Sequence, residues 1–332
     1  MTSLWVTTPP SYVRPYMLAN LDGLELQLAD DVFRVLVSSN ASGGAFTLLG
    51  TNGQTGIQVN PHNHRTFYEN FFSFKGRINL WVNNEQRQLT AHDFGAVPPS
   101  QNHSYQIIDP DAQLTGFIQP GGFEEFFVNI TTPYSSASGA PYPPDQPLDF
   151  PINQFISSAP HFDVNLEPTA NLSYDMINGT SRGGVWRTGN NTLPGNSSTP
   201  YFLASNYGPK YLHRALGQVI APRSTANETD GNFTISTIVM RKKLSNETIA
   251  EQTFDVHQTF QVLEGQLSIG IAGFDEKMST GDVVFIPAGT PFTYWSDVKY
   301  TKIFVGTAGE GLDYKLIREG EPWDYAVFPA YL

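Results

Sequence analysis

The chain has 332 residues, 40% of them hydrophobic, which is enough for two domains with cores of their own. Its 19 Lys and Arg are outnumbered by 31 Asp and Glu, and the formal charge of −12 argues against nucleic acid and anionic membrane surfaces, which select basic patches. No apolar run approaches the roughly 18 residues that a membrane span requires. We expect a soluble protein with no nucleic acid or membrane partner.

The composition predicts an all-β protein. The chain contains 29 Gly, 24 Pro, 23 Phe and 15 Tyr, as is typical of many short strands joined by turns. Runs such as 78–82 (INLWV) and 233–240 (FTISTIVM) are β-rich and bounded by turn residues. No long helical period competes with them.

Residues 56–76 carry the most informative pattern, G-x5-H-x-H-x4-E-x6-G, in which the polar positions are His62, His64 and Glu69. Two histidines at i and i+2 on a strand point to the same face, so both imidazoles can enter a barrel interior. A carboxylate on the neighbouring strand can complete that face. The pattern therefore predicts a metal site in the N-terminal half.

A fourth ligand is expected from a distant hairpin, and His103 follows the turn of residues 93–102. Three neutral imidazoles and one carboxylate suit Cu, Fe, Ni, Mn or Zn better than Ca or Mg. These residues alone do not distinguish between the five metals.

The surroundings of Glu69 predict an aromatic pocket. Phe67 and Phe71 lie on the same face of a regular strand as Glu69, whereas Tyr68 and Phe72 face the other way. Such a pocket suits a flat aromatic substrate. A small dicarboxylate such as oxalate would need a cationic clamp, and the one basic side chain among these positions, Arg65, is expected to point outward.

Residues 131–160 contain seven prolines and almost no charge, which indicates an extended linker. The expected organisation is an N-terminal metal-binding domain at 1–130, the linker at 131–160 and a C-terminal domain at 161–332. The linker is also expected to cover the mouth of the pocket as a lid.

An internal repeat relates the two halves by one constant shift in numbering, the repeat offset, which takes Phe71 to Phe260. The same shift aligns Gly76 with Gly265, Asp93 with Asp282, and Pro98 with Pro287. Matched Gly and Pro imply matched turns, so the chain is expected to contain two copies of one β unit.

The repeat offset turns the four ligand positions into Glu251, Thr253, Gln258 and Phe292. A phenylalanine in place of a ligand fills the site with apolar volume. We therefore expect the second unit to have kept the fold and lost the metal. A different site around His257 is the alternative, but Asp255 is its only evident companion.

On these motifs the chain resembles the cupin superfamily. Residues 56–76 match the first cupin motif throughout, and residues around Pro98 and His103 match the second in part. His92, Ser100 and Ile107 depart from the second motif, at two positions that are usually Gly and one that is usually Asn. The resemblance implies two jelly-roll barrels in one chain.

The runs HNHRTFYENFF, DPDAQLTGFIQPGGFEEFF and YGPKYL, with the linker and the degenerate second unit, resemble the fungal quercetin 2,3-dioxygenases over essentially the whole chain. The resemblance implies one Cu(II) per chain on His62, His64, Glu69 and His103, with other divalent metals left open. It implies a flavonol bound through its 3-hydroxyl, addition of O2 across the heterocyclic ring, and release of a depside and carbon monoxide. The matching pocket positions are Phe33, Leu49, Thr51, Phe71, Tyr105, Leu114, Ile118 and Phe123.

Glu69 is the candidate general base. A metal-bound flavonol hydroxyl is easier to deprotonate, and a carboxylate within hydrogen-bond reach can take its proton. Two other readings stay open, a manganese-dependent oxalate-degrading bicupin and a non-catalytic bicupin of the binding or seed-storage type. The first usually binds metal in both units, and the second predicts loss of ligands in both.

Ten Asn-X-Ser/Thr triplets predict a secreted, extracellular glycoprotein carrying N-linked glycans. No apolar leader precedes Thr2, so a signal peptide would be missing from this sequence. The oligomeric state is not fixed by the sequence, which leaves a homodimer open. The triplets begin at Asn40, Asn102, Asn129, Asn171, Asn178, Asn190, Asn196, Asn227, Asn232 and Asn246.

Overall fold

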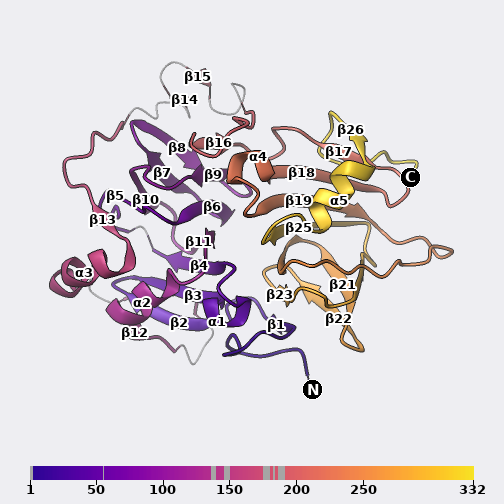
Figure 1. Ribbon diagram of the computed structural model, residues 1–332, viewed down its shortest axis with the longest axis horizontal. Coiled ribbons are helices and arrows are strands. Elements are labelled where there is room, and N and C mark those ends of the chain that lie inside the picture. The colour runs from indigo at the N-terminus through magenta and orange to yellow at the C-terminus, as the bar shows by residue number, and fades with distance from the viewer. Residues whose placement is uncertain are drawn as a thin grey trace.

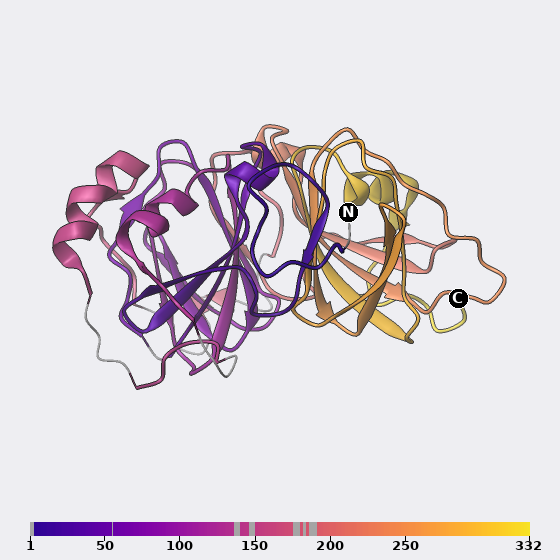
Figure 2. The same cartoon turned by 90° about the horizontal axis from the view of Figure 1, so that it is seen from below.

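The protein consists of two β barrels that lie side by side (Figures 1 and 2). The computed structural model describes residues 3–54, 56–135, 140–145, 150–174, 180–181, 184–185 and 191–332. Within this part, each barrel contains an eight-stranded sheet, paired with a five-stranded sheet in the first barrel and a three-stranded sheet in the second. The predicted all-β, two-barrel architecture is confirmed.

The larger sheet of the first barrel supplies Glu69, and the smaller one supplies two of the histidines. In order across the larger sheet, the strands are β12 (Thr132–Pro133), β2 (Leu24–Leu28), β3 (Asp31–Val37), β4 (Thr47–Gly53), β11 (Ala112–Gln119), β6 (Tyr68–Lys75), β9 (Phe94–Val97) and β16 (Tyr201–Leu203). Across the smaller sheet they are β13 (Asn165–Leu166), β5 (His62–Asn63), β10 (His103–Ile107), β7 (Ile78–Val82) and β8 (Glu85–Leu89).

The second barrel repeats this plan with a shorter second sheet. Its larger sheet has the order β1 (Tyr16–Leu18), β23 (Val283–Ile286), β20 (Gln258–Glu264), β25 (Tyr300–Thr307), β19 (Thr234–Arg241), β18 (Gln218–Ser224), β17 (Tyr211–His213) and β26 (Glu321–Pro322). Its smaller sheet has the order β22 (Phe274–Ser279), β21 (Gln266–Ile271) and β24 (Phe292–Trp295). A separate hairpin joins β14 (Thr180–Ser181) to β15 (Gly184–Val185).

The strand register reproduces the repeat offset that the sequence predicted. On β6, Glu69 pairs with Val97 of β9 and with Ile118 of β11. On β20, the equivalent Gln258 pairs with Ile286 and with Thr307, which are the equivalents of those two partners. The two halves are therefore copies of one unit down to the pairing of individual residues.

Two residues that replace glycine in the second motif, His92 and Ser100, have the same left-handed backbone as the equivalent glycines of the second unit. His92 has φ of 69° where the second unit has Gly281 at 96°, and Ser100 has φ of 67° where Gly289 has 73°. A left-handed residue with a Cβ costs roughly 1–2 kcal/mol. The turn is thus conserved in shape although two of its glycines are replaced.

The two barrels exchange one strand each, β1 and its repeat equivalent β16. The predicted domain boundaries did not include this exchange. β1 pairs with β23 in the second barrel, and β16 pairs with β9 in the first. Residues 161–204, assigned by sequence to the second domain, also contribute β13, which pairs with β5 of the first barrel. Side chains from both halves, including Phe46, Phe117, Phe233 and Phe285, share one buried cluster.

The short helices lie outside the sheets, and two of them carry a buried acid at repeated positions. The helices are α1 (Ser39–Ser42), α2 (Glu124–Ile130), α3 (Ile152–Ser158), the 3-10 helix η1 (Ala159–Phe162), α4 (Ala226–Thr229) and α5 (Leu312–Glu319). Glu124 accepts a hydrogen bond from the Thr47 hydroxyl, and Asp313 accepts one from the Ser236 hydroxyl at 2.7 Å. Both pairs follow the repeat offset and hold a helix onto its barrel.

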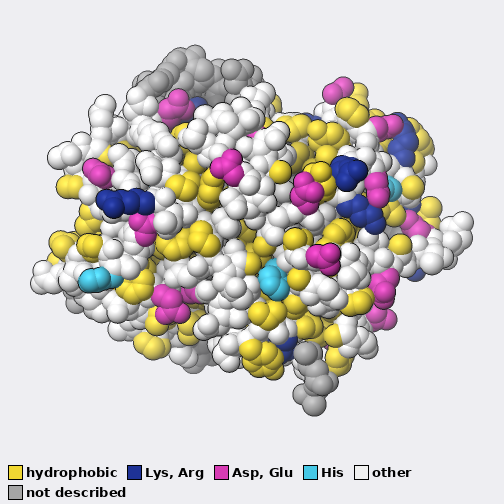
Figure 3. Space-filling model, in the orientation of Figure 1, with side chains coloured by type: hydrophobic (Ala, Val, Ile, Leu, Met, Phe, Trp, Pro, Cys, Tyr) yellow, Lys and Arg dark blue, Asp and Glu magenta, His cyan; other side chains and the backbone are white. Residues whose placement is uncertain are grey.

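The surface carries no continuous basic patch on the face drawn in Figure 3, where the few Lys and Arg side chains are interspersed with Asp and Glu. Among the described residues, no helix is long and apolar enough to cross a membrane.

Candidate metal centre

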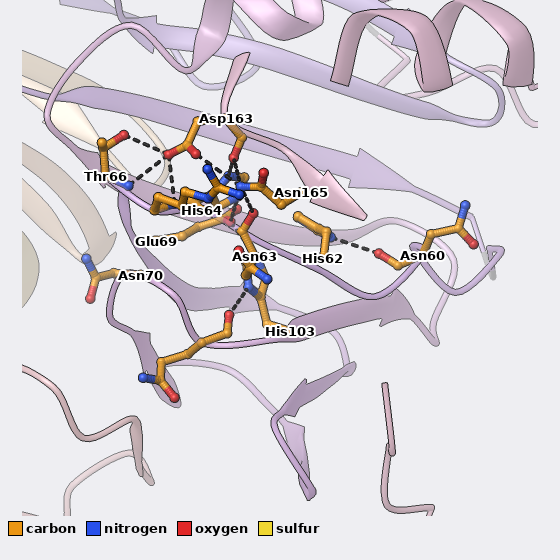
Figure 4. Close-up of polar contacts among 12 residues, drawn as sticks. Asn60, His62, Asn63, His64, Thr66, Glu69, Asn70, His103, Asp163 and Asn165 are labelled. Atoms are coloured by element: carbon orange, nitrogen blue, oxygen red, sulfur yellow. Dashed lines mark hydrogen bonds and ion pairs between the residues drawn. The ribbon is translucent and has the colours of Figure 1, made fainter. Parts of the chain in front are cut away.

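The first barrel brings the four predicted ligands together inside it (Figure 4). His62 lies on β5 opposite His103 of β10, and Glu69 lies on β6 in the facing sheet. His64 follows β5. One donor atom from each side chain lies within 4.8 Å of the others, and all three histidines are buried.

The carboxylate of Glu69 faces two of the imidazoles directly. Its Oε2 atom lies 2.8 Å from Nε2 of His103 and 3.1 Å from Nε2 of His64. Burial alone would raise the pKa of Glu69, but protonated His103 and His64 donate hydrogen bonds to its carboxylate, and these bonds and the two charges hold that pKa well below its ordinary value. Positive charge between these groups, whether from ring protons or from a metal cation, therefore keeps Glu69 ionised.

The other ring nitrogen of each imidazole, Nδ1, forms a hydrogen bond with a backbone carbonyl. Nδ1 of His62 donates to Asn60 O at 2.8 Å, Nδ1 of His64 donates to Asp163 O at 2.8 Å, and Nδ1 of His103 donates to Gln101 O at 3.1 Å. A carbonyl only accepts, so Nδ1 carries the hydrogen in each ring. In a neutral imidazole, Nε2 then presents a lone pair to the centre of the cluster.

This arrangement fits a metal ion. When the rings of His64 and His103 are neutral, their Nε2 lone pairs and the Glu69 carboxylate converge as acceptors, and a metal cation between them takes the place of the ring protons. Burial, followed by the neighbouring His103 and His64, lowers the pKa of His62 well below its ordinary value, which keeps this imidazole neutral as a ligand must be. The site is thus suited to a metal that accepts three nitrogens and one oxygen.

Asp163, which the sequence did not single out, holds the turn that carries His64. Its carboxylate Oδ2 accepts hydrogen bonds from Arg65 N at 2.8 Å, Thr66 N at 2.8 Å and Thr66 Oγ1 at 2.7 Å. Asp163 has left-handed backbone at φ of 57°, directly after η1. It therefore fixes both the imidazole of His64 and the backbone that follows it, while Arg65 itself is exposed as expected.

A cavity of about 320 Å³ opens on the cluster, with His62 and Glu69 in its wall. This volume lies within the range of small-molecule sites. Its wall is largely aromatic and aliphatic: the apolar side chains include Leu28, Phe33, Ile57, Val59, Tyr105, Phe123, Phe126, Phe127, Phe150, Ile152, Phe155 and Val164.

Three of the eight predicted pocket positions, Phe33, Tyr105 and Phe123, line this cavity. The other five are buried in the same barrel but do not line it. Leu49 and Ile118 pack in the cluster that contains Phe33, and the remaining three are equally enclosed. These five are Leu49, Thr51, Phe71, Leu114 and Ile118.

The residues that sequence reasoning missed come from α2, the linker and α3. Phe126 and Phe127 belong to the run GGFEEFF and lie on α2, while Phe150 precedes α3 and Phe155 lies on that helix. Phe127 stacks on Phe33 with ring centroids 4.2 Å apart. The aromatic repetition in GGFEEFF was a signal for the first two. The 131–160 linker was expected over the pocket mouth, but its sequence did not indicate which of its side chains would face the cavity.

The second barrel has no equivalent site at the repeated positions. Phe292 is buried against Phe260 and Phe254, and the side-chain oxygen of Gln258 accepts a hydrogen bond from Leu312 N at 2.8 Å. Among the described residues, the one group of at least three His, Asp or Glu side chains with metal-ligand spacing is that of the first barrel.

Comparison with known proteins agrees with this arrangement. No family model matches the chain. The chain is 38% identical over 346 residues to a quercetin 2,3-dioxygenase of Aspergillus japonicus, covering 99% of both proteins. It is 29% identical over 129 residues to a quercetin 2,3-dioxygenase of Bacillus subtilis (strain 168), covering 39% of this chain and 38% of that protein.

Solved bicupin structures share the fold at low identity. Oxalate decarboxylase from Bacillus subtilis gives a TM-score of 0.54 at 12% identity, over 91% of this chain and 78% of that one. Procruciferin, an 11S globulin from Brassica napus, gives 0.53 at 11% identity, over 90% and 85%. These likenesses concern the fold alone, whereas the identity over nearly the whole length is decisive: the chain belongs to the quercetin 2,3-dioxygenase family.

Proposed function

We propose that this protein is a copper-dependent dioxygenase that cleaves the heterocyclic ring of flavonols such as quercetin with O2, giving a depside and carbon monoxide. The observation that carries the proposal is the His62, His64, Glu69 and His103 cluster opening on an aromatic cavity in a chain of this family. The reaction balances, because the depside and carbon monoxide together contain all the atoms of the flavonol and O2.

The cavity walls suit a flat, aromatic substrate. Phe33, Phe123 and Phe127 present ring faces and edges, with Phe123 and Phe127 in edge contact at 5.4 Å. Such walls bind a polycyclic ring by apolar burial and exclude water from the reacting carbon atoms. Tyr105 adds a phenol whose pKa is raised well above its usual range, first by burial, so it stays protonated.

A bound redox-active ion would acidify the flavonol 3-hydroxyl and exchange an electron with the flavonol, which opens a path to triplet O2. Glu69 would take the proton of that hydroxyl, and the position of its carboxylate in the cavity wall supports this role. His62, His64 and His103 would hold the ion, and their Nδ1 contacts keep the rings oriented.

We also propose that the 131–160 linker serves as a lid. Phe150, Ile152 and Phe155 belong to the cavity wall, and they support this role because a flavonol would be enclosed partly by linker side chains. Residues 136–139 and 146–149 of the linker lie outside the described part of the chain.

The oxalate-degrading alternative is disfavoured by the character of the cavity. Oxalate needs cationic partners, and no Lys or Arg occurs among the described residues that line the wall. Elemental analysis of the purified protein, followed by oxygen uptake with quercetin and with oxalate, separates the candidates. We expect one metal ion per chain, copper, and uptake with quercetin alone. Absence of metal would favour the non-catalytic alternative, and manganese with oxalate turnover would favour the other enzyme.

Secretion and N-glycosylation are proposed on the exposure of the sequons. In the described part of the chain, the Asn side chains at 40, 129, 171, 196, 227, 232 and 246 are exposed, whereas Asn102, beside His103, is half-buried. Asn178 and Asn190 lie outside the described residues. A mass decrease after endoglycosidase treatment of protein expressed in a eukaryotic host would support this, and an unchanged mass would contradict it.

A further inference from the structure

The cavity has a polar region that the proposed reaction does not use. Asp30, in the turn between β2 and β3, and Asp31, the first residue of β3, are part of its wall. The rest of the wall is mainly aromatic and aliphatic, and an aspartate is rarely enclosed without a partner.

The position of Asp31 on β3 places its side chain on the cavity side of the strand. Asp31 and Phe33 are two residues apart on this strand, so their side chains point to the same face, and Phe33 forms part of the aromatic wall. Gly53 on the neighbouring strand makes room for the carboxyl, because a Cβ there would lie 1.7 Å from Asp31 Oδ1. The turn is therefore built to accommodate this group.

One oxygen of each carboxyl is enclosed by the protein without a hydrogen bond. These atoms are Oδ1 of Asp31 and Oδ2 of Asp30, which have no partner among the described residues. Asp30 is only 3% exposed, whereas Asp31 is half-buried in the cavity wall, so the rest of its carboxyl is within reach of a ligand. A buried polar atom without a partner is costly, and a protonated carboxyl lowers that cost.

The pKa values of the two acids are raised to different extents. Burial, then the charge of Asp30, raises the pKa of Asp31 well above its ordinary value. Burial also raises the pKa of Asp30. The shift favours the protonated form of Asp31, which can donate a hydrogen bond, and a carboxyl oxygen can also accept one. Both fit a phenolic hydroxyl, which donates and accepts.

We propose that Asp31, supported by Asp30, is a specificity-determining residue that binds a hydroxyl group on a ring of the flavonol other than the one that carries the 3-hydroxyl. This inference rests on the proposed function. His62 and Glu69 occupy β5 and β6, whereas the acidic pair lies where the β2–β3 turn meets β3 in the same cavity. A substrate whose 3-hydroxyl lies at the metal ligands can therefore present another ring to Asp31. Flavonols with further hydroxyl groups should then bind more tightly than a flavonol that has the 3-hydroxyl alone.

The test compares quercetin with 3-hydroxyflavone, which lacks the other hydroxyls. Metal-loaded wild type and the variants Asp31→Asn and Asp31→Leu are titrated with each flavonol without O2, and kcat/KM is measured with O2. We expect Asp31→Leu to weaken quercetin binding by about tenfold or more and leave 3-hydroxyflavone binding unchanged or tighter. Asp31→Asn keeps a neutral donor and acceptor and should retain most of the preference.

An equal change for both flavonols in Asp31→Leu would overturn the inference. If that variant does not fold, the wild type decides, because it should bind quercetin about tenfold more tightly than 3-hydroxyflavone, and equal affinities would overturn the inference. Wild type that binds and turns over both flavonols without preference thus contradicts this role alone. Wild type that binds neither contradicts the proposed function as well.

Discussion

The imidazole of His64 and the backbone carbonyl of Asp163 are joined by a hydrogen bond of 2.8 Å between residues 99 positions apart in the chain. The same aspartate accepts hydrogen bonds from Arg65 and Thr66 through its carboxylate. A segment that follows the linker thus completes a metal site formed otherwise by the strands of residues 62–107.

Replacing Asp163 should weaken metal binding. Asp163→Gly keeps the left-handed backbone and removes the carboxylate, so the turn after His64 loses three hydrogen bonds. Loss of such an outer contact typically lowers metal affinity about 10–100-fold, and a competitive chelator titration measures it. Asp230→Gly is the matched control, since Asp230 is also a left-handed aspartate after a helix but lies in the second unit. Equal affinity in the two variants would contradict the role of Asp163.

The clustering of the candidate metal ligands was predictable because most of their pattern is local. His62, His64 and Glu69 follow one another closely in the chain, and strand periodicity together with the repeat offset indicated both the cluster and its absence at the repeated positions of the second unit. Asp163 and Phe155 could not be found in this way, because their contacts depend on the path of the linker. The exchange of β1 and β16 between the barrels could not be predicted either. A three-residue strand is too short for its sequence to indicate which strand it pairs with.

Loss of a direct ligand should have a larger effect than loss of Asp163. His64→Ala or His103→Ala removes an Nε2 donor from the cluster, and affinity should fall beyond the roughly 100-fold expected for an outer contact. Metal content after dialysis measures this. His161→Ala serves as control, because His161 is exposed and outside the cluster. A full metal load in either ligand variant would refute the site.

Glu69→Gln separates binding from catalysis. The amide oxygen can still reach a metal, but it cannot take up a proton from the substrate, so much of the metal should remain while kcat falls by at least about 100-fold. Steady-state rates combined with metal analysis test this. Glu125→Gln, on an exposed position of α2, should leave both unchanged. Rates close to wild type in Glu69→Gln would exclude Glu69 as the base.

Flavonol binding should protect the linker from proteolysis. A flavonol in the cavity would contact Phe150, Ile152 and Phe155, and these contacts would stabilise the linker where it covers the cavity. Limited proteolysis with and without quercetin, in the absence of O2, should show slower cleavage within 131–160 in the presence of the flavonol. Identical cleavage rates would argue against a lid.

His92 should make the protein less stable in acid. Lys302 Nζ donates to His92 Nδ1 at 3.1 Å, and burial, then the charges of Lys302 and Arg223, lowers the pKa of His92 to about 3. In the unfolded chain this group takes up a proton near pH 6.5. The unfolded state therefore binds more protons between pH 6.5 and 3, so stability is full above this window and falls as the pH drops through it.

The corresponding variant is His92→Asn, because Asn tolerates the left-handed backbone of this position. Between pH 7 and 5, wild type should lose about 1–2 kcal/mol more of its unfolding free energy than the variant does. Chemical denaturation at the two pH values measures the difference. A pH dependence that is the same in both proteins would contradict a neutral, buried His92.

Carbon monoxide release from quercetin by the copper-loaded protein is the most direct test of the proposed dioxygenase. We expect one carbon monoxide for each quercetin and each O2 consumed, with loss of the activity on copper removal and its return on copper addition. Consumption of quercetin without carbon monoxide, or at the same rate in protein stripped of metal, would contradict it.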